Sequence, residues 1–365
     1  MAYTSFGLND TLTVKLFSKM LNHAERDSLD IAPLQGKSQD AIIQIKDETE
    51  KGAGDKVTFG LRTRLSQKGF TENQTVEGNA ESLTTYADAI YINEMCCNVG
   101  AKSNNTIDAQ RVPYNLRQEC KDAASDWWRD RKSATFFNQV GGYTPAGVES
   151  ATSGAVYVGN NTVTAPAGTS ELVRQIWAGS AADDQSLTSS DGFILSLIDR
   201  AVEAARSGPR MIRPIMVGGQ PKYVLYLSEG QVTTLRTTTT TGGWQDITKF
   251  TYSGVDVSKN PLYSGALGEY NGCILRRSQD VTRGVNSSSG ASDADTRRAV
   301  LLGAQAAVAA YGRKNYGPSR YRWNEELLNH KTRLEVTAWS IWGLKKAVFN
   351  SVDHGALVIS TYSLT

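Results

Sequence analysis

The sequence has few of the side chains on which most enzyme chemistry depends. Its 365 residues include only three histidines, His23, His330 and His354, which lie far apart and have no carboxylate at metal-ligand spacing. Nucleophilic catalysis needs a base close to the nucleophile, and no H-E-x-x-H, P-loop or nucleophile-elbow motif occurs. We therefore predict no catalytic residue, no metal site and no cofactor, and interpret each histidine as a structural or surface residue.

Other features that could suggest a site have a simpler interpretation. The pairs Asp183-Asp184 and Glu325-Glu326 have no partner signal, so we expect solvated loop ends rather than acid–base pairs. Gly218-Gly219 lacks the Lys and Ser/Thr that hold a phosphate, and we interpret it as a turn. Tryptophans could form a platform for a sugar or a base, but spacing favours core or subunit-interface positions for Trp127, Trp128, Trp323, Trp339 and Trp342.

The sequence also lacks the patterns of a zinc protein or a membrane protein. The four cysteines are Cys96, Cys97, Cys120 and Cys273, and none forms a C-x-x-C pair, so we expect free thiols in a reducing compartment. No apolar run approaches the roughly 20 residues that cross a bilayer. Residues 1–10 lack the charged and apolar regions of a secretory leader. We expect a soluble chain made in the cytoplasm.

Charge is nearly balanced, with 39 basic and 37 acidic residues and a net charge of +2. Tight binding to duplex DNA requires a local cationic excess, which is not visible here. Hydrophobic residues make up 40% of the chain, enough for a sizeable core, and the 33 glycines predict many turns and hinges.

A long hairpin is the clearest predicted element. Residues 55–65 alternate, with Val57, Phe59 and Leu61 on one face, and residues 82–92 repeat the same period. A polar tip, residues 69–79, connects them. Because an isolated two-stranded hairpin is marginal in water, we expect it to lie against another subunit. Glycines at its base (Gly52, Gly54, Gly60) and at its tip (Gly69, Gly78) are candidate hinges.

Four helices are predicted. The first, residues 111–139, has Pro113 in its first turn and ends at Gly141-Gly142. The second begins at Ser189 or Ser190 and continues to about Arg206, where Ser207-Gly208-Pro209 stops it. A short one follows a Ser228 cap through Leu235, and Ala299 to Tyr311 is predicted as a small-residue helix.

Strands are predicted around these helices. Tyr223 to Leu227 is a candidate for a central sheet position, and a strand at Ile274-Leu275 follows the turn signature Asn271-Gly272. Further strands are expected at 155–158, 334–338, 344–349 and 357–362. Residues 1–48 form no sustained pattern and are interpreted as a docked arm. The mixed order of elements predicts an α+β fold without internal repeats.

A set of segments, in order along most of the chain, resembles a known family. The segments are SQDAIIQIK (38–46), GDKVTFGLR (54–62), EGNAE (77–81), QRVPYNLR (110–117), DWW (126–128), LLGAQAA (301–307) and GLKKAVFN (343–350). Together they resemble the major capsid proteins of tailed bacteriophages related to that of coliphage N-four.

The resemblance implies the Hong Kong 97-type capsid fold and a shell function. In that fold residues 1–48 would be the N-terminal arm, 49–95 the extended E-loop hairpin and its base, and 96–184 the peripheral (P) domain with the spine helix at 111–139. Residues 185–320 would be the axial (A) domain, and 321–365 would return as strands of the P-domain. Some members crosslink a Lys to an Asn, but Lys68 and Asn79 in the hairpin are not accompanied by an identifiable Glu base.

The resemblance also implies partners and a location. Copies would form hexamers and pentamers of an icosahedral head around double-stranded DNA, which they would touch through non-specific contacts. Scaffolding and portal proteins, and in some members decoration proteins, would take part, and we expect a separate scaffolding protein because the arm is short. Assembly would take place in the host bacterial cytoplasm, and no membrane partner is expected.

Three other classes remain alternatives at this point. A bacterial nanocompartment shell has the same fold but encloses an enzyme. A hydrolase acting on cell-wall polymers is disfavoured because the acid–base constellation is missing. A tail or decoration protein would not close into particles by itself. Nucleic acid in purified particles, and self-assembly seen by electron microscopy, separate these alternatives.

Overall fold

The computed structural model describes residues 29, 31–51, 53–102, 106–111, 115–144, 161–238, 268–312 and 320–363. Most of the expected arm, residues 1–28 and 30, lies outside the described residues, as do the strand expected at 155–158 and the proposed hinge Gly52. The chain divides into two compact units. The first comprises Met1–Arg26, Cys96–Trp128 and Trp323–Trp339, and the second comprises Asp27–Met95, Arg129–Arg322 and Ser340–Thr365.

The first unit is built on one long helix and a set of paired strands. Its elements are β5 (Asn93–Lys102), α2 (Ile107–Arg111), the first half of α3 (Leu116–Gly141), β14 (Arg322–Leu328) and the first half of β15 (Arg333–Lys346). Strands β14 and β5 both pair with β15. The small core contains Cys120 of α3 and, from β15, Leu334 and Val336. Trp128 Nε1 donates to Ala338 O at 3.1 Å, which ties the helix to the strand.

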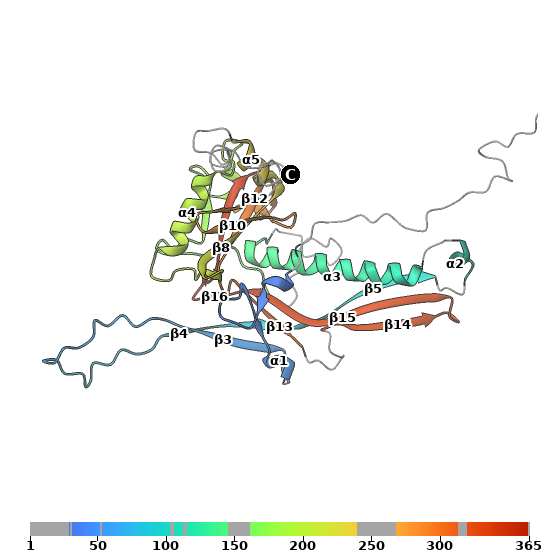
Figure 1. Ribbon diagram of the computed structural model, residues 1–365, viewed down its shortest axis with the longest axis horizontal. Coiled ribbons are helices and arrows are strands. Elements are labelled where there is room, and N and C mark those ends of the chain that lie inside the picture. Colours follow the sequence, from blue (N-terminus) through green and yellow to red (C-terminus); the bar gives the residue numbers. More distant parts are fainter. Residues whose placement is uncertain are drawn as a thin grey trace, which may run out of the picture. The chain divides into compact units, whose positions relative to one another are not determined.

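An eight-stranded mixed sheet forms the centre of the second unit (Figure 1). Its main order is β6 (Gln175–Trp177), β18 (Ala356–Tyr362), β12 (Ser292–Leu302), β8 (Gln220–Leu227), β10 (Cys273–Arg277) and β9 (Glu269–Tyr270). The remaining two strands are β11 (Arg283–Val285), which pairs with β12, and β7 (Ile215–Val217), which pairs with β8. Strand β8 is parallel to β10 and antiparallel to β12, so the predicted central strand at Tyr223 to Leu227 is confirmed.

Two helices complete the core of this sheet, and their ends follow the local sequence. Helix α4 (Leu195–Arg206) buries an apolar stripe that includes Leu197, Ile198 and Ala201. Helix α5 (Glu229–Thr237) starts with a reciprocal capping box between Ser228 and Gln231, as the predicted serine cap implies. This arrangement satisfies two backbone N–H groups that a bare helix start would leave unpaired.

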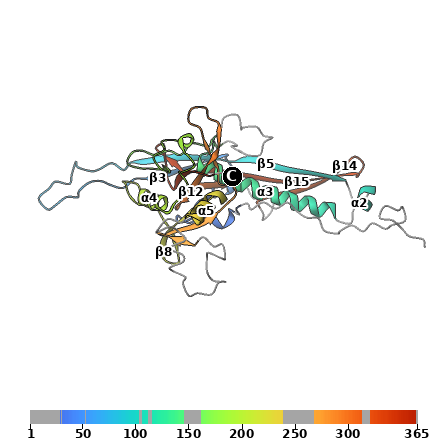
Figure 2. The ribbon, with the colours of Figure 1, turned by 90° about the horizontal axis from the view of Figure 1, so that it is seen from above.

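A second set of strands in this unit supports the predicted hairpin. Strand β2 (Ile43–Lys46) pairs in parallel with β13 (Ala307–Tyr311), and β13 pairs antiparallel with the second half of β15. Strands β3 (Lys56–Arg62) and β4 (Thr85–Tyr91) form the hairpin and pair antiparallel, Val57 opposite Ile90. We call residues 56–91 the ribbon. It leaves the body of the unit as two extended strands (Figures 1 and 2).

The shorter elements of the second unit connect these parts. They are η1 (Ala32–Leu34), β1 (Gln35–Gly36), α1 (Glu48–Lys51), η2 (Asp184–Ser186), β16 (Val348–Phe349) and β17 (Val352–Asp353). The turns follow the predicted chemistry: Asn271 and Gly272 have φ of +46° and +73°, and Gly218 and Gly219 have φ of +60° and +80°.

The helix predicted at Ala299 to Tyr311 is wrong. These residues end β12 and form β13, and both strands are buried on both faces at this point. A strand covered on both sides has no alternation, and its small apolar residues fit a helical pattern equally well.

Two helix starts were also placed too early. The predicted 111–139 helix begins at Leu116, after the separate α2, and continues to Gly141; Gly142, with φ of +63°, ends it. The helix expected from Ser189 begins at Leu195, because Asp191 closes a turn by accepting hydrogen bonds from Thr188 N at 2.9 Å and Thr188 Oγ1 at 2.8 Å. Ile194, the residue just before the helix, is exposed.

Candidate interaction surface

The ribbon changes from buried to exposed along a single face. Val57 and Ile90 are buried in a cluster with Val308 and Phe349, and Phe59 and Leu61 are packed against its edge. The same face continues past β3 to Leu65, which is 56% exposed. The apolar face of the ribbon, which we call the apolar stripe, is therefore covered by the core of its own subunit at the base and is uncovered further out.

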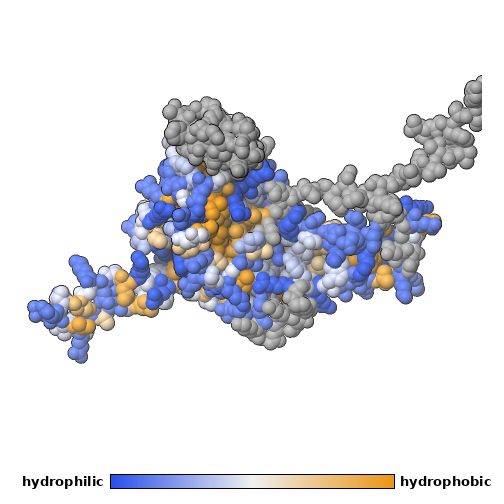
Figure 3. Space-filling model, viewed as in Figure 1, coloured by the Kyte–Doolittle hydropathy of each residue, from blue (hydrophilic) through white to orange (hydrophobic). Residues whose placement is uncertain are grey.

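Large apolar side chains are concentrated on the distal part of the ribbon. They are Leu65 at 56%, Phe70 at 39%, Val76 at 62% and Leu83 at 55% exposure. Figure 3 shows apolar patches among polar side chains along this projection. Exposed apolar patches mark a binding surface more often than a free one.

The carboxylate of Glu81 links the outgoing and returning segments of the ribbon beyond β3 and β4. Glu81 accepts hydrogen bonds from Ser66 N at 2.9 Å, Ser66 Oγ at 2.8 Å and Gln67 N at 2.8 Å. These bonds, first that from the Ser66 backbone, lower the pKa of Glu81. Thr63 N also donates to Thr84 O at 3.1 Å, so pairing continues beyond the regular ladder. The distal ribbon thus has internal restraints although its apolar side chains are uncovered.

Polar contacts fix the base of the ribbon to the strands beneath it. Asp88 Oδ1 contacts Lys345 Nζ, and Asp88 Oδ2 accepts from Val348 N at 3.1 Å. Asn161 behaves like a strand partner of Tyr91, since its Oδ1 accepts from Tyr91 N at 2.9 Å and its Nδ2 donates to Tyr91 O at 2.7 Å. Neither Asp88 nor Asn161 was singled out from the sequence, because no motif marks a polar residue whose partners are 70 or more positions away.

Gly343 is required by the same close approach. A Cβ atom at this position would lie 2.0 Å from Tyr91 O, a distance that no side chain tolerates. Gly60, a predicted hinge, lies within β3 opposite Ala87, whereas Gly54, Gly69 and Gly78 have positive φ and open space around them. The structure therefore leaves conformational freedom at three of the proposed glycine hinges and removes it from Gly60.

A buried ion pair joins the end of α3 to the eight-stranded sheet. Arg298 Nη2 lies 2.6 Å from Asp184 Oδ2, and the two side chains are 6% and 1% exposed. Arg298 Nη1 also donates to Gly141 O at 3.1 Å and Gly142 O at 2.8 Å, so it caps the C-terminus of α3. The sequence-based expectation that Asp183-Asp184 is a solvated loop end is wrong for Asp184, because the partner that buries it is 114 residues away.

A second buried pair lies near the C-terminus. Lys346 Nζ is 2.9 Å from Asp353 Oδ2, with both side chains 1% exposed. Burial lowers the pKa of Lys346 and raises that of Asp353. Arg174 Nε donates to Asp353 O at 2.9 Å, and burial lowers the pKa of Arg174 to about 10. Lys346 Nζ also donates to Thr164 O at 3.1 Å, so these contacts hold both ends of the segment 164–174 against the last strands.

The described part of the chain brings no histidine together with a nucleophile. Burial first, and then the charges of Arg210 and Arg174, lower the pKa of His354 to about 4, and its ring packs edge-on against Phe349 with centroids 5.3 Å apart. His330 lies in an exposed turn with φ of +52°, and His23 lies outside the described residues. Groups of three or more metal-ligating side chains are absent from the described residues.

Glu325 lies in a strand rather than at the expected loop end, and it has a definite partner although its side chain is still partly in solvent. It lies within β14 and accepts from Arg117 Nε and Nη2, each at 2.8 Å. Trp323 Nε1 donates to the same carboxylate at 2.6 Å. The guanidinium, followed by the indole N–H, lowers the pKa of Glu325. A shallow pocket of about 450 Å³ adjoins this group, but its strongest polar groups already bond one another.

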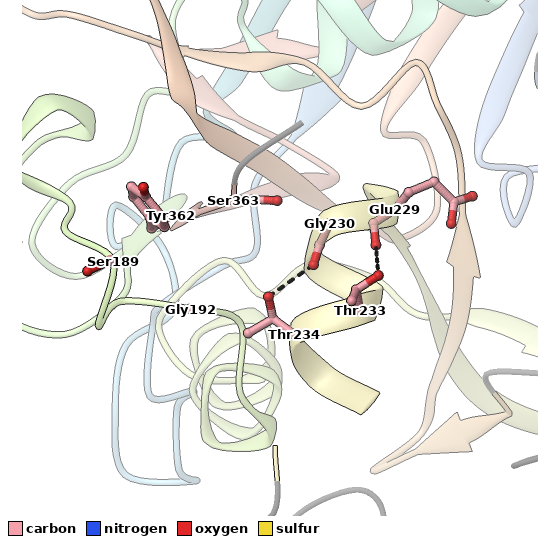
Figure 4. Close-up of a pocket in the computed structure, with 8 residues that line it drawn as sticks. All are labelled: Ser189, Gly192, Glu229, Gly230, Thr233, Thr234, Tyr362 and Ser363. Carbon is pink, nitrogen blue, oxygen red and sulfur yellow. Dashed lines mark hydrogen bonds between the residues drawn. The ribbon is translucent and has the colours of Figure 1, made fainter. Parts of the chain in front are cut away.

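Another pocket, of about 350 Å³, lies beside α5 and is lined by small and hydroxyl side chains (Figure 4). The hydroxyls of Thr233 and Thr234 donate back to Glu229 O and Gly230 O, each at 3.0 Å. The hydroxyls of Thr233 and Thr234 are therefore already bonded, and Glu229, the carboxylate among the lining residues, lies 3.7 Å from Arg277 Nε, so neither threonine is arranged as a nucleophile.

The tryptophans and cysteines mostly have structural positions. Trp128 and Trp342 are each 3% exposed and belong to the core, as predicted, while Trp323 is 39% exposed. All four cysteines are free; Cys96 is exposed, and Cys97, Cys120 and Cys273 are buried. Burial raises the pKa of Cys273 to about 12. Among the described residues, no helix has the length and apolar character needed to cross a bilayer.

A family model and several solved structures match nearly the whole chain. A family model described as "Phage capsid protein" matches residues 5–365. The capsid of Ralstonia phage GP4 is 28% identical, with a TM-score of 0.79 over 100% of this chain and 99% of that chain. The Cyanophage Pam1 capsid is 19% identical, with a TM-score of 0.76 over 98% and 99%.

The head structure of Helicobacter pylori bacteriophage KHP40 shows the same fold at 14% identity, with a TM-score of 0.68 over 99% of both chains. No curated protein matches the sequence. The predicted α+β, Hong Kong 97-type fold is confirmed by these structures.

Proposed function

Because this chain belongs to the phage capsid protein family, we propose a specific way in which its copies hold one another in the head of a tailed phage. The chain is a major capsid protein that forms the head, and its function is structural rather than enzymatic. Copies assemble into an icosahedral shell. In our proposal, the distal ribbon of each copy lies on a neighbouring copy, which covers the exposed apolar stripe.

The observation that carries this proposal is the gradient of exposure along the ribbon. Val57, at the base, is 7% exposed, whereas Leu65, on the same face, is 56% exposed. Fully burying one large aliphatic or aromatic side chain contributes about 1.5–3 kcal/mol, so covering four half-exposed side chains contributes several kcal/mol per copy. Many identical contacts in a closed shell multiply this contribution.

The finer assignments follow from the sequence resemblance. We propose that the chain belongs to the branch related to coliphage N-four, with hexamers and pentamers in the head. Partners would be a separate scaffolding protein, a portal, packaged double-stranded DNA held through non-specific contacts, and decoration proteins where the phage has them. The net charge of +2 supports weak rather than tight contact with DNA. Assembly would take place in the host bacterial cytoplasm.

The division into capsid segments is also a proposal. Residues 1–48 would be the arm, 49–95 the E-loop and its base, 96–184 the P-domain, 185–320 the A-domain and 321–365 the returning strands. This proposal is supported by a hairpin at residues 56–91 and by one long helix, α3, at Leu116–Gly141, close to the bounds expected for the E-loop and the spine helix. Strand β18 pairs with β12 and β6, so the returning strands contribute to the eight-stranded sheet as well.

Deleting residues 66–80 tests the proposal. We expect a folded, soluble subunit but no stable shells, because these residues are exposed and their hydrogen bonds to described residues stay within the ribbon. A milder variant replaces Leu65, Phe70, Val76 and Leu83 by serine. Its control replaces Met216 and Leu327 by serine, because these side chains are 56% and 48% exposed but lie outside the ribbon.

Size-exclusion chromatography and negative-stain electron microscopy, with and without scaffold, measure the yield of closed particles. Closed shells of normal stability from the deletion variant would rule out the role of the ribbon as a strap.

A further inference from the structure

We propose that Asp88 and Lys345 form a latch that fixes the direction in which the ribbon leaves its own subunit, and that this direction determines the size of the closed shell. The inference rests on the proposed function, in which the ribbon binds a neighbouring copy. It assigns to these two residues a positioning role in assembly.

The geometry of Asp88 restrains the ribbon in more than one direction. Its Oδ1 contacts Lys345 Nζ, and its Oδ2 accepts from Val348 N at 3.1 Å. Lys345 Nζ donates in addition to Ala89 O at 3.0 Å, so the ammonium bridges a side chain and a carbonyl of β4. The two side chains are 11% and 20% exposed, which limits competition from water. Because the bonds reach both β15 and β16, they oppose sliding and rotation of β4 alike.

Apolar packing accompanies the latch, since Phe59, Leu61 and Tyr86 lie against the same cluster of buried residues, and the latch adds a directional polar contact to it. Val57 and Ile90 are packed in the core, and Asn161 pairs with both backbone groups of Tyr91. These contacts hold the inner end of β4. Asp88 lies further out along β4, between this fixed end and Thr85, where the regular pairing ends. The latch is therefore the outermost polar contact between the ribbon and the strands β15 and β16 among the described residues.

Leverage explains why a local contact has a distant effect. From Asp88 to the tip near residue 74, an extended strand spans at most about 45 Å at roughly 3.3 Å per residue. A tilt of about 5° at the base therefore moves the tip by about 4 Å, close to the roughly 4.8 Å that separates neighbouring strands. A shift of this size places the apolar side chains of the ribbon over the wrong part of the neighbouring copy. Joining copies at a changed angle changes the curvature of the shell.

Asp88→Asn and Lys345→Met test the latch in the full chain. Asparagine has the shape of aspartate but cannot accept from both Lys345 and Val348 N, because one of its two terminal atoms is an N–H donor. Lys345→Met removes only the ammonium group and leaves the hydrogen bond from Val348 N to Asp88 intact. This variant therefore still tests the latch if Asp88→Asn fails to fold. Lys345→Arg keeps the charge and should restore wild-type behaviour in part. The control is Asp55→Asn, an exposed carboxylate near the start of β3.

Two measurements are made on each variant. In the soluble subunit, hydrogen–deuterium exchange of residues 86–91 should become at least tenfold faster in Asp88→Asn and Lys345→Met, with β12 and β18 unchanged and with no effect of Asp55→Asn. In shells assembled with scaffold, the two variants should give mixed diameters or open sheets, while Asp55→Asn gives the wild-type diameter.

The proposal is overturned if Asp88→Asn and Lys345→Met assemble into uniform shells of wild-type diameter, or if exchange at 86–91 is unchanged. Failure of the proposed function has a different signature: the wild-type chain itself then forms no shells with scaffold, and the exchange measurement still decides whether the latch holds the ribbon.

Discussion

Replacing Arg298 by methionine should destabilise the subunit more than any change to a surface ion pair. Arg298 is nearly fully buried, and its guanidinium bonds Asp184 through Nε at 2.9 Å and Nη2 at 2.6 Å. It also bonds the carbonyls of Gly141 and Gly142 at the end of α3. Methionine has a similar length but makes none of these bonds, so the variant isolates the loss of the charge and its donors.

The expected magnitude follows from what the substitution leaves behind. The buried carboxylate of Asp184 would keep the hydrogen bonds from Val285 N and Trp177 Nε1, each at 3.0 Å, and from Gln175 Nε2 at 3.5 Å, but would lose its cationic partner. Removing one partner of a buried ion pair typically costs about 3–5 kcal/mol, since the other charge is left uncompensated. The control is Arg213→Met, which breaks the pair with Asp40 whose side chains are 50% and 45% exposed. Exposed pairs contribute at most about 1 kcal/mol.

Urea denaturation of the soluble subunit, followed by circular dichroism, measures both variants against the wild type. We expect Arg298→Met to lose about 4 kcal/mol of unfolding free energy and Arg213→Met less than about 1 kcal/mol. Arg298→Lys should fall between them, because lysine keeps the charge but not the planar fork of donors. Equal losses in the buried and the exposed variant would refute the assignment of Arg298 as the link between α3 and the sheet.

Two further outcomes are expected. Gly343→Ala should destabilise the subunit by about 1–3 kcal/mol in thermal or urea unfolding, because the new Cβ would lie 2.0 Å from Tyr91 O. The control, Gly100→Ala, should be nearly neutral, since a Cβ at that position would meet nothing within 4 Å. An unchanged stability of Gly343→Ala would show that β4 does not approach β15 so closely. The pKa of His354 is lowered from 6.5 to about 4, so between these pH values the unfolded chain binds a proton at His354 and the folded chain does not. The contribution of His354 to the free energy of unfolding is therefore complete above pH 6.5 and is lost as the pH falls toward 4. Between pH 7 and pH 5 this loss amounts to about 2 kcal/mol, and His354→Phe should remove that part of the pH dependence; an identical pH profile in the variant would contradict the assigned shift.

Several features determined by neighbours in the sequence were predicted correctly. The ribbon follows from strict alternation, with Val57, Phe59 and Leu61 on the covered face as predicted. The Ser228 cap and the stop at Gly142 depend on one or two residues and on backbone geometry. The family resemblance added the function, because ordered segments identify relatives even where each segment is weak.

Features determined by long-range contacts could not be derived in this way. Residues 299–311 are strands because β12 lies between β8 and β18 and β13 between β2 and β15, and this two-sided burial removes the alternation that identifies a strand. Asp184, expected in solvent, is buried because Arg298 reaches it from β12. Gly343 and Asn161 are required only because β4 passes directly beside them.

The sequence by itself therefore determined that the ribbon is a hairpin of extended strands, where several helices stop, and which family the chain resembles. Local backbone preferences and the alternation of side chains are properties of adjacent residues. Only the tertiary structure decided which charges are buried and how the base of the ribbon is held, because the energy of a buried charge or a close backbone contact depends on a partner that the fold brings from far along the chain.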